Sequence, residues 1–388
     1  MSKEAATKGL ERVIISGGGT GGHIHPAVAI ADEIRQRHPQ CEILFVGAKG
    51  RMEMEKVPKA GYSIVGLWIS GIDRNWRSLR NLTFPLKLLS SLFKAGRIIR
   101  KFKPQLAVGV GGFASGPLLY RAALRGIPTA IQEQNSFPGI TNRLLAKKVQ
   151  LICAGFPGLD RWFPKDRIIE TGNPLRENVT KIQLINSEQR AAALEHFGFT
   201  GDRPVAFIMG GSLGAGSMNE AVMAMAHRIA TDEKELPYDL LWQCGARFQA
   251  TMQAELEALP LPAKQRIVCV GFIDRMDHAY CAADVIASRA GAMSIAELAL
   301  VSKPTLLVPS PVVAEDHQTK NARSLSDRGG AVLVPDGDVV ERLESELTQL
   351  LNDPVRQKSL TDALRGAARP KAAHEVVAAL EKLVIHSQ

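Results

Sequence analysis

The sequence predicts an α/β protein made of two doubly wound, Rossmann-like domains, each built on a parallel sheet. Three observations lead to this expectation. Short apolar segments bounded by Gly or Pro alternate with segments of helical periodicity. The alternation restarts after residue 200, which divides the 388 residues into two series of similar length. A glycine-rich stretch follows the first expected strand of each series, as it does in many doubly wound domains.

The first series opens with a short apolar run that follows a charged tail. Its strands are expected at residues 13–16, 43–47, 106–110 and 129–132. The first helix is expected at residues 26–38, because Pro26 suits a first helical turn and apolar residues recur on one face.

The second series repeats the pattern, and a helix is expected to begin near Met218. Its strands are expected at residues 205–209, 240–243, 266–270, 285–287 and 304–308. We therefore expect an N-terminal domain at 1–176 and a C-terminal domain at 177–365, joined by the polar segment 173–189. The final segment, about 366–388, could pack back on the first domain.

Charge is distributed unevenly along the chain. Residues 1–180 hold 27 Lys and Arg against 13 Asp and Glu, a formal charge of +14, whereas the remaining residues carry −5. The first half therefore suits an anionic partner such as nucleic acid, anionic lipid or a phosphorylated substrate. No run of eighteen apolar residues occurs, so no transmembrane helix is expected. Five cysteines without a Cys-x-x-Cys pair or signal-peptide pattern predict reduced thiols in the cytoplasm.

Three strands run into glycine clusters, at residues 17–22, 109–116 and 210–216. Glycine lets backbone N–H groups approach a ligand, and the helix N-terminus behind the loop attracts anions. Tight β-to-α turns would explain one such cluster, but three favour phosphate or sugar binding.

Neither common nucleotide fingerprint fits the first cluster. Residues 17–22 match G-x-G-x-x-G, but Glu42 lies at the start of the second strand, where a ribose-binding acid should lie at its end. His23 occupies the place of the P-loop lysine. The segment 288–297 offers a better site, since N–H groups at 291–294 could hold a diphosphate and Glu297 a ribose diol. Arg289 could be structural or ligand-binding.

Six motifs in this order resemble one known family. They are GGTGGH (18–23), GVGGFASGP (109–117), EQN (133–135), GNPLR (172–176), GGSLGA (210–215) and SRAGAMSIAE (288–297). Across residues 12–330 the chain resembles the bacterial undecaprenyl-diphospho-muramoylpentapeptide β-N-acetylglucosaminyltransferases, the MurG family, which converts lipid I to lipid II in peptidoglycan synthesis. The resemblance implies a glycosyltransferase-B fold with the active site in an interdomain cleft, UDP-N-acetylglucosamine in the C-terminal domain and the lipid acceptor on the N-terminal one.

The resemblance also implies a set of substrate-binding residues and no cofactor. Phe272 would cover the uracil as a lid. The substrate-binding residues would be Thr20, Gly21, Gly22, Asn135, Arg176, Ser212, Ile273, Ala292, Met293, Ser294, Ile295, Ala296, Glu297 and Gln318. The chain departs from the usual family pattern at Gln132, where a His is common, at His317, where a Gln is common, and at His25.

Inverting transfer requires a base for the acceptor's C4 hydroxyl and charge stabilisation for the departing diphosphate. His23 is our first choice for the base, because imidazole titrates near neutrality. A helix-capping role for His23 and a base role for Glu133 stay open. Backbone N–H groups and Arg176 could hold the diphosphate without a metal, and we interpret the one Asp-x-Asp, at 336–338, as a solvated loop.

A basic and apolar segment at 74–103 suits the surface of an anionic membrane. It holds nine Lys and Arg and no acidic residue, with apolar residues interleaved. On a helix Lys87, Lys94, Arg97 and Lys101 fall within an arc of about 80°, and such a face can lie on a bilayer. We therefore expect a peripheral protein on the cytoplasmic face of the bacterial inner membrane and no nucleic-acid partner, since no nucleic-acid motif occurs.

Three other functions stay open. They are a related transferase with another lipid acceptor such as diacylglycerol, a nicotinamide-dependent oxidoreductase that uses residues 17–22, and a sugar-nucleotide sensor without turnover.

Overall fold

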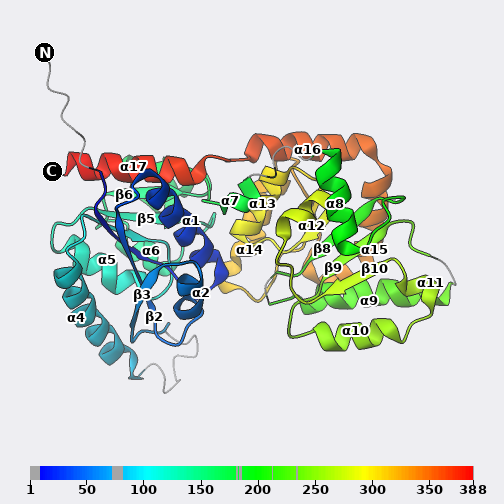
Figure 1. Cartoon of the computed structure of the whole chain (residues 1–388), viewed down its shortest axis with the longest axis horizontal. Coiled ribbons are helices and arrows are strands. Elements are labelled where there is room, and N and C mark those ends of the chain that lie inside the picture. Colours follow the sequence, from blue (N-terminus) through cyan, green and yellow to red (C-terminus); the bar gives the residue numbers. More distant parts are fainter. Residues whose placement is uncertain are drawn as a thin grey trace, which may run out of the picture. The chain divides into compact units, whose positions relative to one another are not determined.

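The computed structural model describes residues 9–71, 82–180, 182, 186–211, 213–232 and 235–387. The chain forms two compact units (Figure 1). One comprises the residues up to Arg176 together with those from Lys371 onward, and the other extends from Glu177 to Pro370. Each unit is described by itself.

The N-terminal unit is built on a parallel sheet, whose described strands run in the order β3-β2-β1-β4-β5-β6-β7. The strands are β1 (Arg12–Ser16), β2 (Glu42–Ala48), β3 (Ser63–Leu67), β4 (Leu106–Gly109), β5 (Thr129–Glu133), β6 (Leu151–Ala154) and β7 (Ile168–Glu170). Its helices are α1 (Gly21–Arg37), α2 (Glu53–Lys59), α4 (Phe84–Phe102), α5 (Ser115–Ala123), α6 (Ile140–Leu145) and α17 (Ala372–His386).

Helices cover both faces of this sheet because its central strands are apolar on both sides. Val13 and Ile15 of β1 pack in one core cluster with residues of α1 and α17. Ile14, between them, points to the opposite face and packs with residues of α4 and α5. The side chains of all three residues are fully buried. Alternate side chains of the single strand β1 therefore pack into two separate hydrophobic cores, one on each face of the sheet.

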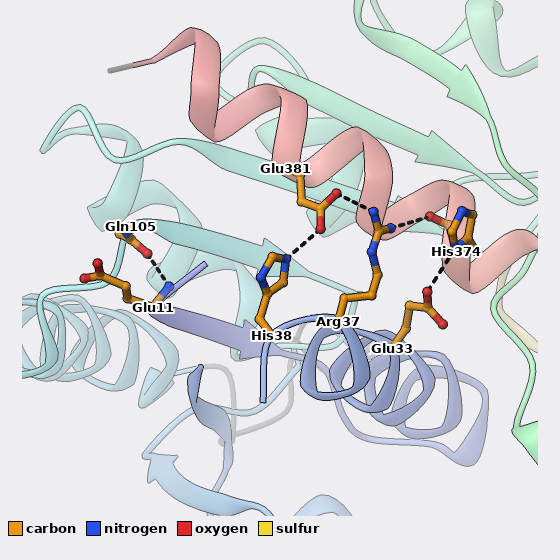
Figure 2. A network of polar contacts seen from close by, with 7 residues as sticks. All are labelled: Glu11, Glu33, Arg37, His38, Gln105, His374 and Glu381. Atoms are coloured by element: carbon orange, nitrogen blue, oxygen red, sulfur yellow. Dashed lines mark hydrogen bonds and ion pairs between the residues drawn. The ribbon is translucent and has the colours of Figure 1, made fainter. Parts of the chain in front are cut away.

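The last helix, α17, returns to the N-terminal unit and packs on α1 (Figure 2). Glu381 of α17 accepts from Arg37 Nη2 at 2.7 Å and pairs with His38 Nε2 at 2.6 Å. Glu33 of α1 pairs with His374 of α17 at 3.1 Å. These polar contacts flank an apolar interface, so the end of the chain is part of the N-terminal unit's core.

The C-terminal unit repeats the architecture, with described parallel strands in the order β10-β9-β8-β11-β12-β13. Its strands are β8 (Val205–Met209), β9 (Asp239–Gln243), β10 (Ile267–Val270), β11 (Val285–Ser288), β12 (Thr305–Leu307) and β13 (Val332–Leu333). Its helices are α7 (Glu177–Thr180), α8 (Ser187–Phe197), α9 (Gly216–Thr231), α10 (Gln249–Glu257), α11 (Leu261–Lys264), α12 (Met276–Ala282), α13 (Ala292–Val301), α14 (His317–Ser326), α15 (Val339–Asn352) and α16 (Pro354–Ala367).

The expectation of two parallel-sheet, doubly wound domains is confirmed. The expected start of the first helix at Pro26 is wrong, because α1 begins at Gly21. Glycine is a poor helix former, so the pattern alone places the start after the glycines. In each unit the strand order reverses direction beside the first strand, between β1 and β4 and between β8 and β11. Ligands of open α/β sheets bind at such switch points, beyond the carboxyl ends of the strands.

Candidate active site

The first glycine loop, residues 17–20, connects β1 to α1 at the switch point of the N-terminal unit. Gly19 has φ +88°, which favours glycine. Its N–H donates to Glu53 Oε2 at 2.8 Å, and the other oxygen of Glu53 accepts from Ala48 N at 2.9 Å. Glu53 is only 1% exposed. The backbone N–H of Gly19 therefore already donates to a buried carboxylate. A dinucleotide's pyrophosphate would need that N–H group as a donor, so this contact disfavours the oxidoreductase hypothesis.

The second glycine cluster packs against the first loop. A Cβ on Gly112 would lie 2.5 Å from Gly18 O, and a Cβ on Gly111 would lie 2.7 Å from Cε1 of His23. Ser115 Oγ lies 2.9 Å from Ser16 O and 2.7 Å from Gly111 O, which links the two strand ends. These glycines allow close backbone packing around His23. These contacts do not test the expectation that the cluster serves phosphate or sugar binding, which stays a prediction.

His23 lies in the first turn of α1, where its N–H contacts Thr20 O at 3.2 Å. Its side chain is half-buried, and Nδ1 lies 2.8 Å from Oε1 of Gln134. Thr20 and Gly22 are exposed and Gly21 is half-buried, so the helix start that carries His23 is open to a ligand. The imidazole does not cap the helix, since its described partner is a side chain of another segment.

Glu133 ends β5 and is 1% exposed. Its Oε1 accepts from Asn135 N at 3.0 Å and Asn135 Nδ2 at 3.3 Å. Its Oε2 accepts from Gly139 N at 3.2 Å and from Asn142 Nδ2 at 2.8 Å. The carboxylate therefore holds the loop after β5 to the start of α6 and fixes the place of Asn135, which is half-buried.

His25 lies three residues after the exposed Gly22 in α1 and is half-buried. Burial, with smaller contributions from the charges of Arg176 and Lys56, lowers the pKa of His25 to about 4. Its ring is thus neutral at physiological pH. Arg176, the last residue of the N-terminal part of this unit, lies close enough to His25 for their charges to interact.

In the C-terminal unit the helix α13 begins at the switch point, directly after β11. Gly291 is its N-cap, no side chain of the described chain caps it, and its first turn has no acidic residue. Ala292 and Ile295 are buried, whereas Met293, Ser294 and Ala296 are partly exposed. The backbone N–H groups of such a turn form an anion-binding site.

Gln318 of α14 lies beside this helix start. Its Oε1 accepts from Ala290 N at 3.2 Å and from Ser310 N at 2.9 Å, so it joins the loops that follow β11 and β12. Because the carbonyl oxygen is held by two backbone donors, the amide presents its Nε2 as the group for a further partner.

Glu297 lies further along α13 and is half-buried, and its carboxylate contacts the neighbouring helix α12. The hydroxyl of Tyr280, a fully buried residue of α12, donates to Glu297 Oε2 at 2.8 Å. Glu297 is therefore not the freely exposed helix residue that its type alone suggests.

The Asp-x-Asp at 336–338 is a short 3-10 helix, and its first aspartate is an ion-pair partner. Asp336 pairs with Arg289 Nη1 and accepts from Ser217 Oγ at 2.7 Å. Arg289 Nη2 also donates to Ser217 Oγ at 2.7 Å. Asp336 is thus held by these contacts and departs from the expectation of a solvated loop, whereas Gly337 and Asp338 are exposed as expected. The contacts of Arg289 with Asp336 and Ser217 favour a structural role for this residue. Within the described residues, no three His, Cys, Asp or Glu side chains gather closely enough to hold a metal ion.

The third glycine cluster follows β8, and Ser212 in it lies outside the described residues. Gly214 is required for packing, because a Cβ there would lie 2.2 Å from Cys244 O. Gln243, at the end of β9, donates to Gly211 O at 2.9 Å and Gly271 O at 3.1 Å, so its amide links the loops after β8 and β10.

A cavity of about 320 Å³ in the C-terminal unit is lined by Val268 and Val270 of β10 and by the residues that follow this strand. Phe272 and Ile273 line it together with side chains of α8 and the loop that leads to α12. Ile273 is 6% exposed whereas Phe272 is 54% exposed. Phe272 is therefore exposed beside the cavity, and its role as a lid over the uracil stays a prediction.

The helix α4 exposes an apolar stripe on the N-terminal unit. Leu86, Leu89 and Phe93 are 62%, 64% and 69% exposed, and the spacing puts Arg97 and Arg100 on the same face. By contrast, Lys87 donates to Ser70 Oγ at 3.1 Å and Lys94 to Gly66 O at 2.7 Å. The expected arc of Lys87, Lys94, Arg97 and Lys101 therefore does not face outward as a whole. Residues 74–81 of the segment lie outside the described residues, and no described helix is both long and apolar enough to cross a membrane.

Sequence reasoning overlooked three residues of these sites. Gln134 and Asn173 lie inside the EQN and GNPLR motifs, so the motifs were a signal for them. No sequence signal distinguished Glu53, since it is one of several charged residues in its helix.

Comparison with known proteins identifies the family. The glycosyltransferase family 28 N-terminal domain matches residues 13–153, and the family 28 C-terminal domain matches residues 205–376. A curated relative from Porphyromonas gingivalis is 47% identical, with 100% of this chain and 99% of the relative covered. Another, from Christiangramia forsetii, is 47% identical over 96% of this chain and 98% of its own length. Both are named UDP-N-acetylglucosamine–N-acetylmuramyl-(pentapeptide) pyrophosphoryl-undecaprenol N-acetylglucosamine transferase.

A solved structure leads to the same group. The crystal structure of Acinetobacter baumannii MurG superposes with a TM-score of 0.74 at 29% identity, and the match covers 96% of this chain and 99% of that one. The chain therefore belongs to glycosyltransferase family 28 and, within it, to the MurG group of N-acetylglucosamine transferases.

Proposed function

We propose that this chain transfers N-acetylglucosamine from UDP-N-acetylglucosamine to the muramoyl-pentapeptide on undecaprenyl diphosphate, which converts lipid I to lipid II. The observation that carries the proposal is the full-length identity of 47% with relatives whose names state this transfer. The helix starts and glycine loops at both switch points are consistent with it.

In this proposal the C-terminal unit holds the donor. The N–H groups at the start of α13, from Ala292 onward, bind the diphosphate. Glu297, whose carboxylate accepts a hydrogen bond from Tyr280, also accepts hydrogen bonds from the ribose hydroxyls. Gln318 donates through Nε2 to a hydroxyl of the sugar. The uracil occupies the cavity at Ile273, and Ser212 contributes from the third glycine loop.

The N-terminal unit supplies the base and receives the acceptor. His23 accepts the proton of the acceptor's C4 hydroxyl while the hydroxyl oxygen attacks the anomeric carbon. The bond from that carbon to the diphosphate oxygen breaks with inversion, and UDP leaves with the electron pair. Glu133 shapes the loop that carries Asn135, because all four of its described donors come from that loop and from α6.

Further donor contacts are proposed for the loop and helix start beside His23. Thr20, Gly21 and Gly22 contact the sugar nucleotide at the open start of α1, together with Asn135. Arg176 adds a positive charge that stabilises the departing diphosphate. No metal ion is required for these roles.

A transfer assay tests the proposal directly. Radiolabelled UDP-N-acetylglucosamine is incubated with lipid I or with diacylglycerol, and labelled lipid and released UDP are measured. We expect label in lipid I alone. Label in diacylglycerol would indicate another acceptor, and donor binding without transfer to either would indicate a sensor. Binding of NADH and of UDP is measured separately by calorimetry. Binding of NADH without binding of UDP would favour the oxidoreductase.

The His23→Ala variant tests the base in the same assay. Loss of general-base catalysis lowers kcat by about 10²- to 10⁴-fold. A His25→Ala variant is the matched control, because it removes a neighbouring imidazole that the proposal leaves out of the chemistry. Unchanged turnover in His23→Ala would remove His23 from the mechanism.

We also propose that the exposed stripe on α4 rests on the cytoplasmic face of the bacterial inner membrane, as a peripheral contact. The stripe combines apolar side chains with Arg97 and Arg100, a composition that binds anionic bilayers. Sedimentation with phosphatidylglycerol vesicles tests this. The double variant Leu89→Glu/Phe93→Glu should bind at least about tenfold more weakly, whereas Leu261→Glu, 64% exposed on the other unit, should bind as the unmodified protein does. Equal binding of both variants would contradict the proposed face.

A further inference from the structure

Three buried side-chain amides form a chain of hydrogen bonds that ends at His23. They belong to Asn173, Gln132 and Gln134, which are 3%, 0% and 1% exposed. An amide has one end that donates and one that accepts, so the direction of such a chain is set wherever one end meets a group of fixed character. Here backbone carbonyls, which can only accept, set it.

The direction can be followed from Asn173. Asn173 Nδ2 donates to Gln134 O at 2.9 Å, so its Oδ1 is the end that accepts from Gln132 Nε2 at 3.0 Å. The oxygen of Gln132 then accepts from Gln134 Nε2. The same Nε2 lies 3.0 Å from Val110 O and 2.9 Å from Gln132 O. Each amide orientation is therefore determined more than once, and Oε1 of Gln134 must be the atom that meets His23.

The contact to His23 assigns the position of its proton. Gln134 Oε1 can only accept, and it lies 2.8 Å from His23 Nδ1. In the neutral ring Nδ1 therefore carries the hydrogen and Nε2 holds the lone pair. Gly111 lies against the ring, where a Cβ would approach Cε1 to 2.7 Å, so the packing also restricts the ring's plane.

We propose that Gln134 is a positioning residue that holds His23 in the tautomer whose Nε2 is free to accept the acceptor's hydroxyl proton. The inference rests on the proposed function in making His23 the base, and it extends that function to the residues that prepare the base. During transfer the hydroxyl proton moves to Nε2 as the oxygen bonds to the anomeric carbon. Gln134 Oε1 then stabilises the resulting imidazolium through the N–H that Nδ1 already carries.

Nuclear magnetic resonance of the ¹⁵N-labelled imidazoles of the full-length protein tests the tautomer without reference to catalysis. Spectra are recorded at about pH 8.5, where an ordinary histidine is neutral, and His23→Ala assigns the signals. We expect a protonated Nδ1 and an unprotonated Nε2 for His23. A protonated Nε2 in the unmodified protein would overturn the inference, whatever the variants do.

Two variants test the role of Gln134. Gln134→Leu removes the acceptor, so the Nε2–H tautomer should appear and kcat should fall by about 10- to 10²-fold, with the KM for the donor unchanged. Gln134→Glu keeps an oxygen opposite Nδ1 and should retain the tautomer, although its second oxygen faces Val110 O and Gln132 O and therefore lowers the stability of the unit. Gln105→Leu is the matched control, since Gln105 also bonds to backbone through Oε1, at 2.7 Å from Glu11 N, in the same unit.

A double variant separates positioning from general damage. His23→Ala/Gln134→Leu should be no slower than His23→Ala alone, because Gln134 acts through His23. Additive losses, or a leucine variant that keeps both the tautomer and full kcat, would overturn the inference. An unmodified protein with the expected tautomer but no transfer to lipid I would instead refute the proposed function and leave the assignment of the imidazole proton intact.

Discussion

Replacing Glu53 tests how the first glycine loop is held. The carboxylate accepts from Gly19 N at 2.8 Å and from Ala48 N at 2.9 Å, and the side chain is 1% exposed. A hydrogen bond to a charged group contributes about 1.5–3 kcal/mol, so Glu53→Ala should destabilise the N-terminal unit by roughly 3–6 kcal/mol. For a unit of this size, 1 kcal/mol corresponds to about 2–4 °C in Tm. The transition of that unit should therefore fall by at least about 6 °C.

Glu53→Gln should cost about half as much, because one amide oxygen still accepts while the NH2 group faces the other backbone donor. Differential scanning calorimetry measures the transitions, and hydrogen exchange at Gly19 and Ala48 reports the local loss directly. Glu55→Ala is the matched control, since Glu55 lies in the same helix, is exposed and pairs only with Lys59 among the contacts described. If Glu53→Ala and Glu55→Ala melt and exchange alike, the proposed anchoring is wrong.

The remaining predictions concern His25 and Gln318. The unfolded state protonates His25 below about pH 6.5 and the folded state only near its pKa of about 4, so stability should be lost as the pH falls through this window, by up to about 3 kcal/mol. Comparing Tm at several pH values for the unmodified protein and His25→Asn checks this, and identical pH dependence would contradict it. Gln318→Glu keeps the oxygen that accepts from the two backbone amides but loses the Nε2 donor, so the KM for UDP-N-acetylglucosamine should rise about tenfold. The added carboxylate lies beside the start of α13, where the diphosphate is proposed to bind, so the Kd of UDP should rise as well, and an unaltered KM would exclude the contact to the sugar.

Many strands with apolar character could be predicted from sequence, but β6, which is apolar and buried throughout, was not among the expected strands. The segment Val205–Met209 has five buried residues between a proline and two glycines, and its predicted bounds agree with β8. By contrast, β3 contains a glycine and β13 has two residues, so neither gives a periodic signal. Gly21 and Gly22 oppose helix formation locally, and tertiary packing decides that α1 includes them.

The sequence predicted which residues belong to the site, but it could not predict which atoms those residues contact. The motifs predicted that His23 and Glu133 matter, yet only the structure shows that one meets an amide oxygen while the other is surrounded by donors. Periodicity likewise placed Lys87 and Lys94 on one side of a helix, but it cannot determine which side packs on the protein. Long lysine side chains reach back to nearby oxygen atoms when their own side faces inward.

The return of α17 to the N-terminal unit has a consequence for folding during synthesis. Val376, Leu380 and Val384 fill a core whose other members come from the beginning of the chain. The C-terminal unit is one continuous segment, so all of its residues leave the ribosome before the final helix does. The N-terminal unit, most of which is made first, therefore keeps the apolar face that α17 covers open until that helix has been synthesised.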